Sequence, residues 1–263
     1  MDKEAFVDIN NRQLYYSIQN SKYATGGRPF LVFLHEGLGC SAQWRQFPRE
    51  LSEAVGCPVL LLDRFGYGLS EIKNKANEAL YMHEEAYSFL PQLLEKLDIR
   101  EKIIPIGHSD GGTIALLFAA KYPQSVMALI VEAAHVFCEN VTQNGVKEVI
   151  EKYKQGPLKK HLAAYHADKT DTLFNNWSRF WISDNALKWD ITNILPQIKS
   201  PILAIQGKDD NYGSVKQLTA ILEKTHSTTI TYHIKDCGHI PHYEKKTAVF
   251  SAMRQFILNQ LND

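Results

Sequence analysis

The sequence feature that most constrains the fold is a serine at position 109 with a glycine two residues away on either side. An apolar run, residues 103–106, precedes it, and a segment with helical character, residues 113–121, follows it. The stretch Gly107-His108-Ser109-Asp110-Gly111 therefore predicts a strand, a sharp turn and a helix. On such a turn the serine oxygen projects from the sheet edge, and the first amides of the helix favour negative charge there. An ordinary serine in a glycine-rich turn is the alternative, which the flanking strand and helix disfavour.

The rest of the chain alternates short apolar strands with helical segments. Residues 6–10 and 13–18 flank the turn-prone pair Asn10-Asn11 and predict a hairpin. Short continuous apolar runs are typical of strands that are covered on both faces. Such runs lie at residues 30–34, 58–62, 103–106, 126–131, 201–206 and 228–234, and helical spacing is found at 44–55, 79–97, 113–121, 215–224 and 243–261. The pattern predicts an α/β fold with a mostly parallel, doubly wound sheet, whose ligands bind at the carboxyl ends of the strands.

This alternation stops between residues 135 and 195. Short helix-like pieces there mix lysine and histidine with aromatic residues such as Trp177, Phe180, Trp181 and Trp189. We interpret this segment as a helical cap inserted between two strands, so that residues 1–134 and 196–263 form the two parts of one core. A chain of 263 residues is long enough for one large domain with such an insertion.

Charge and cysteine content restrict the partners. Lysine plus arginine equals aspartate plus glutamate, at 29 each, which gives no overall charge for binding nucleic acid or an anionic membrane. No apolar run approaches the roughly 20 residues of a membrane span. We therefore expect a cytoplasmic monomer or homodimer that acts on a small molecule. The four cysteines show no C-x-x-C spacing, which favours reduced thiols, and we expect no metal and no cofactor.

Serine is a weak nucleophile at neutral pH and needs a base, together with a group that orients the base. Asp209-Asp210 follows the predicted strand at 201–206, and His239 follows the strand at 228–234. The carboxyl ends of parallel strands meet at one edge of a sheet, so we expect these side chains to lie near Ser109. Each of them alone could be an ordinary surface residue. The order serine, acid, histidine, with each residue at a strand end, favours a catalytic site.

Taken together, these segments resemble the α/β-hydrolase superfamily, and in particular its small bacterial members with a helical cap. The resemblance covers the chain outside the cap. The segments that carry it are residues 35–39, residues 63–70, the turn at Ser109, Gly207 followed three places later by Asp210, and Gly238-His239 before Pro241.

By this resemblance Ser109 attacks a carbonyl carbon, His239 takes and returns the proton, and Asp210 holds the imidazole. The resemblance also implies an oxyanion hole made by the backbone amides of Gly37 and Asp110. Many relatives have glycine in place of the residue before Gly37, which is glutamate here, and this leaves the amide of the next residue, Leu38, as an alternative.

The resemblance implies a serine hydrolase that cleaves a small carboxylic ester through an acyl-enzyme. A thioesterase, a lactonase and a carbon–carbon bond hydrolase are alternatives that use the same three residues. An aspartate nucleophile would indicate a dehalogenase or epoxide hydrolase, and Ser109 argues against both. An alternative of another class is a ligand receptor or signalling protein that keeps the fold without turnover. Leu38, Trp177 and Trp181 are candidate substrate contacts.

Several other polar residues have structural interpretations. We expect His35 and His108 to pack or hydrogen-bond beneath the site, and Arg64 to anchor its own loop. His161, His166 and Asp168 lie in the cap without a metal-ligand motif.

Glu36 is a special case, because a carboxylate aimed into the oxyanion hole would oppose catalysis. We expect its side chain to turn away and to be neutralised by loop amides or by His135. A second carboxylate, Glu132, is expected near the same sheet edge, and such a pair would raise at least one pKa.

Overall fold

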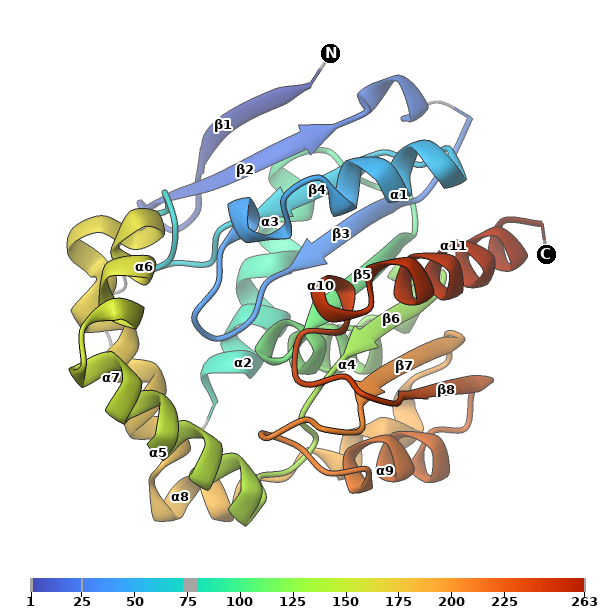
Figure 1. The fold of residues 1–263 in the computed structure, drawn as a ribbon. Helices are drawn as coiled ribbons and strands as arrows, with labels where there is room; N and C mark the ends of the chain where they lie inside the picture. Colours follow the sequence, from blue (N-terminus) through green and yellow to red (C-terminus); the bar gives the residue numbers. More distant parts are fainter. Residues whose placement is uncertain (1, 25, 73–79, 263) are drawn as a thin grey trace.

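The computed structural model describes residues 2–24, 26–72 and 80–262. Within them, eight strands form one sheet in the order β1-β2-β4-β3-β5-β6-β7-β8 (Figure 1). The bounds are Lys3–Asp8 (β1), Gln13–Gln19 (β2), Phe30–Leu34 (β3), Val59–Leu62 (β4), Ile103–His108 (β5), Leu129–Glu132 (β6), Ile202–Gly207 (β7) and Thr229–Ile234 (β8). Strands β3 to β8 run parallel, whereas β2 pairs antiparallel with both β1 and β4. The predicted mostly parallel α/β sheet is confirmed.

The N-terminal hairpin is also confirmed. Strands β1 and β2 are joined by a turn in which Asn10 and Asn11 have φ angles of 55° and 59°. Asparagine tolerates this left-handed backbone better than most residues, which explains why the pair sits at the turn.

Helices cover both faces of the sheet, which is why its inner strands are continuously apolar. All five residues of β3 are buried. One face is covered by α1 and α11, whose Leu51, Met253 and Phe256 belong to a single apolar cluster with β3 and β4. The other face is covered by α3, α4 and α9. The bounds of the helices outside residues 135–195 are Phe47–Val55 (α1), Tyr81–Glu84 (α2), Leu90–Lys96 (α3), Asp110–Lys121 (α4), Lys216–Lys224 (α9), Pro241–Glu244 (α10) and Lys246–Asn262 (α11).

Several helices differ in detail from the sequence prediction, including the closing helix predicted at 243–261, which is divided between α10 and α11. Helix α4 begins at Asp110, directly after Ser109 and three residues before the predicted start. Ala79, the first residue of the predicted helix 79–97, lies outside the described residues, and the rest of that segment contains a π-helical turn, Glu85–Phe89, between α2 and α3. The amphipathic segment 44–55 begins with a 3₁₀ turn, Ser41–Trp44, before α1.

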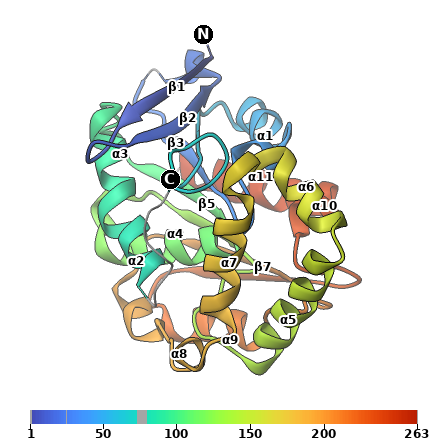
Figure 2. The same cartoon turned by 90° about the vertical axis from the view of Figure 1, so that its left-hand side faces the viewer.

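Residues 135–195, here called the cap segment, connect β6 to β7. They contain α5 (Asn140–Lys154), α6 (Pro157–His166), α7 (Thr170–Trp181) and α8 (Asp184–Leu187). Figure 2 shows α5, α6 and α7 in front of the sheet. Trp177 and Trp181 on α7 are buried in the same apolar cluster as Leu116 of α4, so the cap segment shares the apolar core of the helices on this face.

Two further observations concern the predicted setting of the protein. No helix in the described residues is long and apolar enough to cross a membrane. The four cysteines, Cys40, Cys57, Cys138 and Cys237, are all buried free thiols.

Candidate active site

Ser109 lies on a strained turn between β5 and α4. Its φ and ψ angles are 53° and −117°, a backbone conformation that residues other than glycine rarely adopt. The turn is possible because two neighbours are glycines. A Cβ atom at Gly107 would lie 2.1 Å from the carbonyl oxygen of Gly111, and one at Gly111 would lie 2.0 Å from that of Leu34. The backbone therefore turns within a space that only glycine fits, and the serine is held at the sheet edge.

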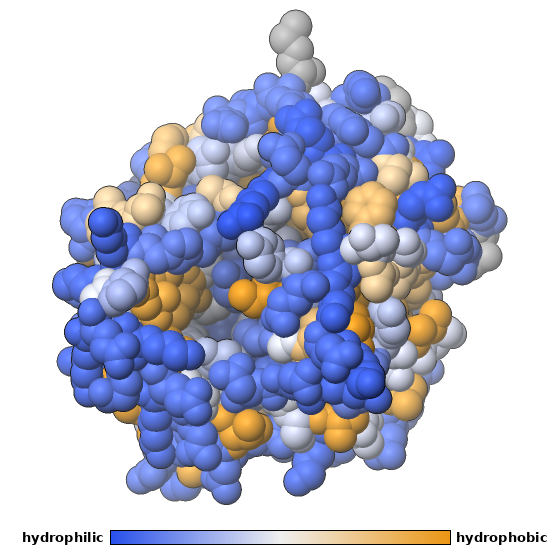
Figure 3. Space-filling view, viewed as in Figure 1, coloured by the Kyte–Doolittle hydropathy of each residue, from blue (hydrophilic) through white to orange (hydrophobic). Residues whose placement is uncertain are grey.

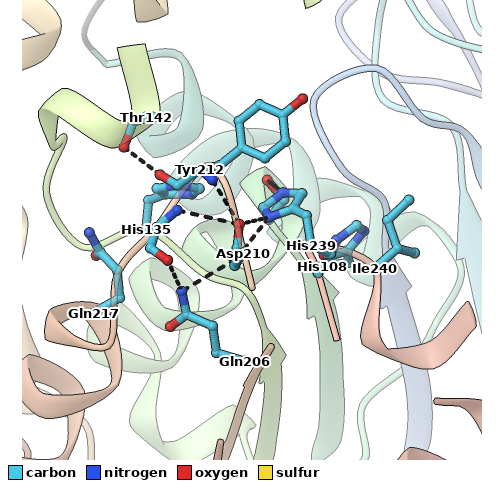
Figure 4. A network of polar contacts seen from close by, with 12 residues as sticks. His108, His135, Thr142, Gln206, Asp210, Tyr212, Gln217, His239 and Ile240 are labelled. Atoms are coloured by element: carbon cyan, nitrogen blue, oxygen red, sulfur yellow. Dashed lines mark hydrogen bonds and ion pairs between the residues drawn. The ribbon is translucent and has the colours of Figure 1, made fainter. Parts of the chain in front are cut away.

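The three residues predicted from strand ends lie in hydrogen-bonding contact. His239 Nε2 is 3.0 Å from Ser109 Oγ. His239 Nδ1 is 2.9 Å from Asp210 Oδ1 and 3.0 Å from Oδ2. These are ordinary hydrogen-bond lengths, and they connect the ends of β5, β7 and β8. Figure 4 shows the Asp210 end of this chain beside His239.

Asp210 is held by more than the histidine. Its Oδ1 accepts from the backbone amide of Tyr212 at 2.8 Å, and its Oδ2 accepts from Gln206 Nε2 at 3.3 Å (Figure 4). Burial by itself would raise the pKa of this carboxyl, but the charge and hydrogen bond of His239 and the Tyr212 amide outweigh burial and lower the pKa to about 2. Its neighbour Asp209 is exposed and makes no such contact with His239. The geometry therefore distinguishes the two aspartates.

The segment after β3 lies on the side of Ser109 away from Asp210 and His239, because β3 and β7–β8 lie on opposite sides of β5. Gly37 and Leu38 line the same cavity as Ser109 and Asp110. Within the described residues, no hydrogen bond is found from the backbone amides of Gly37 and Leu38, and Asp110 is the first residue of α4, whose amide has no acceptor within the helix. These amides are therefore available to a ligand.

Glu36 does not make the contacts expected from the sequence. Its carboxylate lies against Gly39, and its Oε2 is 3.6 Å from His108 Nδ1. His135 instead contacts the carbonyl oxygen of Tyr212 at 3.0 Å, so the expected Glu36–His135 pair is wrong. The sequence predicted a raised pKa for at least one of two neighbouring carboxylates, Glu36 and Glu132, and Glu36 is not that one. Burial favours a rise, but the charge of the nearby His108 ring lowers the pKa of Glu36 to about 2.

Glu132 binds a different histidine. Its Oε2 is 2.8 Å from His242 Nδ1 and accepts from the backbone amide of the same residue at 3.1 Å. Burial alone would lower the pKa of His242, but the charge of Glu132 raises it. This buried pair lies behind His108, whose ring is 5.2 Å from that of His242. His108 in turn contacts the His239 carbonyl oxygen through Nε2 at 2.7 Å, as expected of a structural histidine.

A cavity of about 180 Å³ opens onto Ser109. Its polar lining comes from Thr142 and from residues already described, and its apolar wall is formed by Leu38, Val146, Trp177, Trp181, Tyr212 and Ile240. The two tryptophans that the sequence suggested as substrate contacts thus both face the site. Figure 3 shows the surface hollowed between the cap segment on the left and the rest of the molecule.

Sequence reasoning missed some residues of the site. The ring of Tyr212 lies against that of His239, with centroids 4.5 Å apart and planes tilted by 52°. Thr142 of α5 donates to the Tyr212 carbonyl oxygen at 2.5 Å. Val146 lines the cavity from the same helix. Tyr212 lies two residues after Asp210, and this proximity is a signal that could have found it. Thr142 and Val146 have no motif, because their position depends on how α5 packs.

The histidines of the cap segment make structural contacts. Within the described ranges, no group of three or more histidine, cysteine or acidic side chains could hold a metal ion. His166 is buried. Its Nδ1 accepts from the Gly68 amide at 2.9 Å, and its Nε2 donates to the Leu38 carbonyl oxygen at 3.0 Å.

Comparison with known proteins defines the class first. The family described as alpha/beta hydrolase fold matches residues 29–181. The chain belongs to this family, as its resemblance predicted.

The sequence identity between this chain and individual relatives is low. The chain is 23% identical to a proline iminopeptidase of Saccharolobus solfataricus, over 97% of this chain and 92% of that protein. It is 25% identical to a 2-succinyl-6-hydroxy-2,4-cyclohexadiene-1-carboxylate synthase of Enterobacter sp., over 94% and 99% of the two chains. Among solved structures it superposes on a thermophilic esterase from Thermogutta terrifontis with a TM-score of 0.73 at 19% identity, covering 98% and 99%. The family and the relative named proline iminopeptidase support a hydrolytic enzyme.

Proposed function

We propose that this protein is a serine hydrolase that cleaves a small carboxylic ester through an acyl-enzyme intermediate. The observation that carries the proposal is the contact chain Ser109–His239–Asp210 at 3.0 and 2.9 Å, which ends at a cavity. In this proposal His239 Nε2 takes the serine proton while Oγ attacks the ester carbonyl carbon. Asp210 holds the opposite ring nitrogen and stabilises the imidazolium.

The negative charge that develops on the substrate oxygen is stabilised by the amides of Gly37 and Asp110 in this proposal. His239 then gives its proton to the departing alkoxide, which leaves as the alcohol. Water attacks the acyl-enzyme with His239 as base, and the carboxylic acid and Ser109 are regenerated. The substrate, water and these side chains supply every atom and proton that the proposed steps require.

The cavity supports a short apolar acyl group. Its volume of about 180 Å³ is below the roughly 300–1,000 Å³ of sites for drug-sized ligands. In our proposal Leu38, Trp177 and Trp181 contact this acyl group, and residues 135–195 act as a cap that closes the site from above.

Amide cleavage is the second candidate, because one relative is named proline iminopeptidase. An enzyme that removes N-terminal residues needs an acidic group free to bind the substrate amine. Two acidic side chains, Glu36 and Asp110, line this cavity. Glu36 lies beside His108, and Asp110 Oδ2 accepts from the Tyr81 hydroxyl at 2.6 Å and lies 3.6 Å from Arg64, whereas Asp110 Oδ1 has no hydrogen-bond partner among the described residues. The Arg64 charge opposes the binding of a substrate ammonium at Asp110, which favours an ester over an aminoacyl amide.

Labelling and a substrate panel test the proposal. A fluorophosphonate should attach to Ser109 and to no other residue, as located by peptide mass spectrometry. Wild-type protein should hydrolyse p-nitrophenyl propionate with a burst of p-nitrophenol, whereas S109A should lose at least about 1,000-fold in kcat. Propionyl and prolyl p-nitroanilides provide the matched amide arms. Faster cleavage of the prolyl anilide, or ligand binding without turnover, would reject the ester proposal.

A further inference from the structure

Arg64 is a buried cation between the two segments that supply the oxyanion amides. It follows β4 by two residues, and its side chain is 1% exposed. Its Nη2 donates to the carbonyl oxygen of Glu36 at 2.8 Å and lies 3.6 Å from Asp110 Oδ2. We propose that Arg64 is a positioning residue that orients the Gly37 amide and fixes it relative to Asp110. This inference rests on the proposed oxyanion role of these amides.

The geometry of the peptide bond carries the first step. The carbonyl of Glu36 and the amide of Gly37 belong to the same peptide unit. A trans peptide is planar, so its C=O and N–H groups point in opposite directions. No cis peptide occurs in the described part of the chain. A hydrogen bond that holds the Glu36 oxygen from behind therefore sets the direction in which the Gly37 amide points.

The Glu36 oxygen has three donors. Besides Arg64, it contacts His35 Nδ1 at 2.8 Å and accepts from the Gly39 amide at 3.2 Å. His35 Nε2 accepts from the Arg64 amide at 3.1 Å, which assigns the ring proton to Nδ1. Burial, together with the Arg64 charge, holds the pKa of His35 well below its ordinary value, so the ring stays neutral. Donors at the carbonyl also polarise the peptide and strengthen its N–H as a donor.

The Asp110 carboxylate explains why the donor should be a cation. This side chain is 1% exposed and lies beside the site where negative charge develops. An unpaired anion there would oppose that charge. Arg64 and the Tyr81 hydroxyl, which donates at 2.6 Å, offset it. One guanidinium thus joins the loop after β3 to the start of α4 and offsets the carboxylate nearest to Ser109.

Loop anchoring is the competing explanation, and Lys169 provides a matched control for it. Lys169 of the cap segment donates to the carbonyl oxygens of Gly68 at 2.6 Å and Ser70 at 2.5 Å, in the same loop as Arg64. It makes no contact with the Glu36 peptide. K169M therefore loosens the loop without releasing the Gly37 amide.

The variants must distinguish the loss of the Arg64–Glu36 hydrogen bond from the loss of the positive charge beside Asp110. R64M alone removes the cation beside two buried carboxylates, Asp110 and Glu85, and risks unfolding. The informative comparison is R64M/D110N against D110N, with R64K as the conservative variant and thermal unfolding as the check on folding. The readouts are kcat and KM for p-nitrophenyl propionate, and the rate constant for phosphonylation by a fluorophosphonate. In that reaction Oγ bonds to phosphorus, fluoride leaves and His239 takes the proton, whatever the natural substrate is.

We expect R64M/D110N to lose about 10- to 100-fold in kcat relative to D110N, less than the ~100- to 1,000-fold lost with an oxyanion donor itself. The KM of R64M/D110N should stay within about threefold of that of D110N, and its phosphonylation should slow in parallel with kcat. R64K should recover part of the loss. The kcat of K169M should stay within about twofold of wild type. Equal kcat in R64M/D110N and D110N, a loss confined to KM, or an equal loss in K169M would overturn the inference. Failure of the ester proposal gives a different result, because wild type would then show no S109A-sensitive ester turnover while the phosphonylation rates still rank the Arg64 variants.

Discussion

Asp210 and Asp209 are adjacent in sequence, and only their surroundings distinguish them. Asp210 receives donors from His239, Tyr212 and Gln206, whereas Asp209 is exposed. We predict that D210N lowers kcat by about 1,000-fold or more, because the histidine loses the acceptor that fixes its tautomer. D209N should stay within about threefold of wild type. Steady-state kinetics on both proteins measure this, and similar losses in the two variants would refute the assignment of Asp210.

Glu36 is predicted to contribute to stability rather than to bind substrate. Its folded pKa of about 2 lies below the ordinary 4.5, so the unfolded chain binds more protons between these values. The stability that Glu36 contributes is therefore present above about pH 4.5 and is lost as the pH falls towards 2. In E36Q the free energy of unfolding should change less between pH 5 and pH 3 than in wild type, as followed by urea denaturation. E53Q, at an exposed position, is the control and should keep the wild-type slope.

The residues of the proposed catalytic triad could be predicted from the sequence because they follow apolar runs. Ser109, Asp210 and His239 each come within a few residues of a strand end, and parallel strands bring these ends to one edge. The partners of Glu36 and the role of Arg64 were not readable. They depend on how separate loops meet in space, and no local pattern records which loop contacts which.

At the scale of elements, the turn at Ser109 stores backbone strain. Its φ of 53° with ψ of −117° costs a residue with a side chain about 1–3 kcal/mol. Glycine adopts this backbone readily but adds unfolded-state entropy of roughly 0.5–1 kcal/mol. We predict that S109G is more stable than S109A by about 1 kcal/mol in denaturant unfolding, with both proteins inactive. A lower stability for S109G would mean that the turn is unstrained.

The end of α6 is attached to the core through His166, and this attachment should depend on pH. Burial lowers the pKa of His166 more than the Leu38 hydrogen bond raises it. Protonation would place a second proton on Nδ1, which accepts from the Gly68 amide. The charged and titratable groups around the ring are Asp63, Lys169 and the adjacent residues His35 and Glu36, on three segments.

The direction of the pH dependence follows from the lowered pKa of His166. The folded pKa lies below the ordinary 6.5, so the contribution is present above about pH 6.5 and is lost as the pH falls towards the folded value. We predict that stability declines less between pH 7.5 and pH 5.5 in H166N than in wild type. Asparagine keeps an acceptor for Gly68 and does not ionise. H161N, at an exposed position of the same helix, should decline as wild type does, and identical slopes in all three proteins would refute the prediction.

The elements themselves were largely predictable, and their interruptions were not. Strands β3 and β4 were recognised because helices bury both of their faces, so almost every residue in them is apolar. The π-helical turn Glu85–Phe89 interrupts a segment with unbroken helical spacing, and nothing in that spacing marks it. The packing of α5 and α7 over Ser109 was equally hidden, because the same apolar stripe could face any surface.

At the scale of the whole molecule, the cavity belongs to neither the sheet nor the cap segment alone. Ser109 and His239 come from strand ends, whereas Val146, Trp177 and Trp181 come from α5 and α7. Trp177 and Phe180 also belong to the main apolar cluster, so removing residues 136–195 altogether would expose a large apolar surface. A single substitution in α7 therefore tests acyl-chain selection more cleanly than a cap-less protein.

We predict that W181A shifts the preference from short to longer acyl chains. Removing the indole enlarges a cavity of about 180 Å³, and one methylene in an apolar pocket changes transition-state binding by about 1–3 kcal/mol. The ratio of kcat/KM for p-nitrophenyl hexanoate to that for the acetate should therefore rise about tenfold or more. L173A is the matched control, because Leu173 is buried on the same helix but does not line this cavity. It should lose about 2–5 kcal/mol of stability and keep the wild-type ratio. An unchanged ratio in W181A, or an equal shift in L173A, would show that acyl selection does not reside in the contact between α7 and the site.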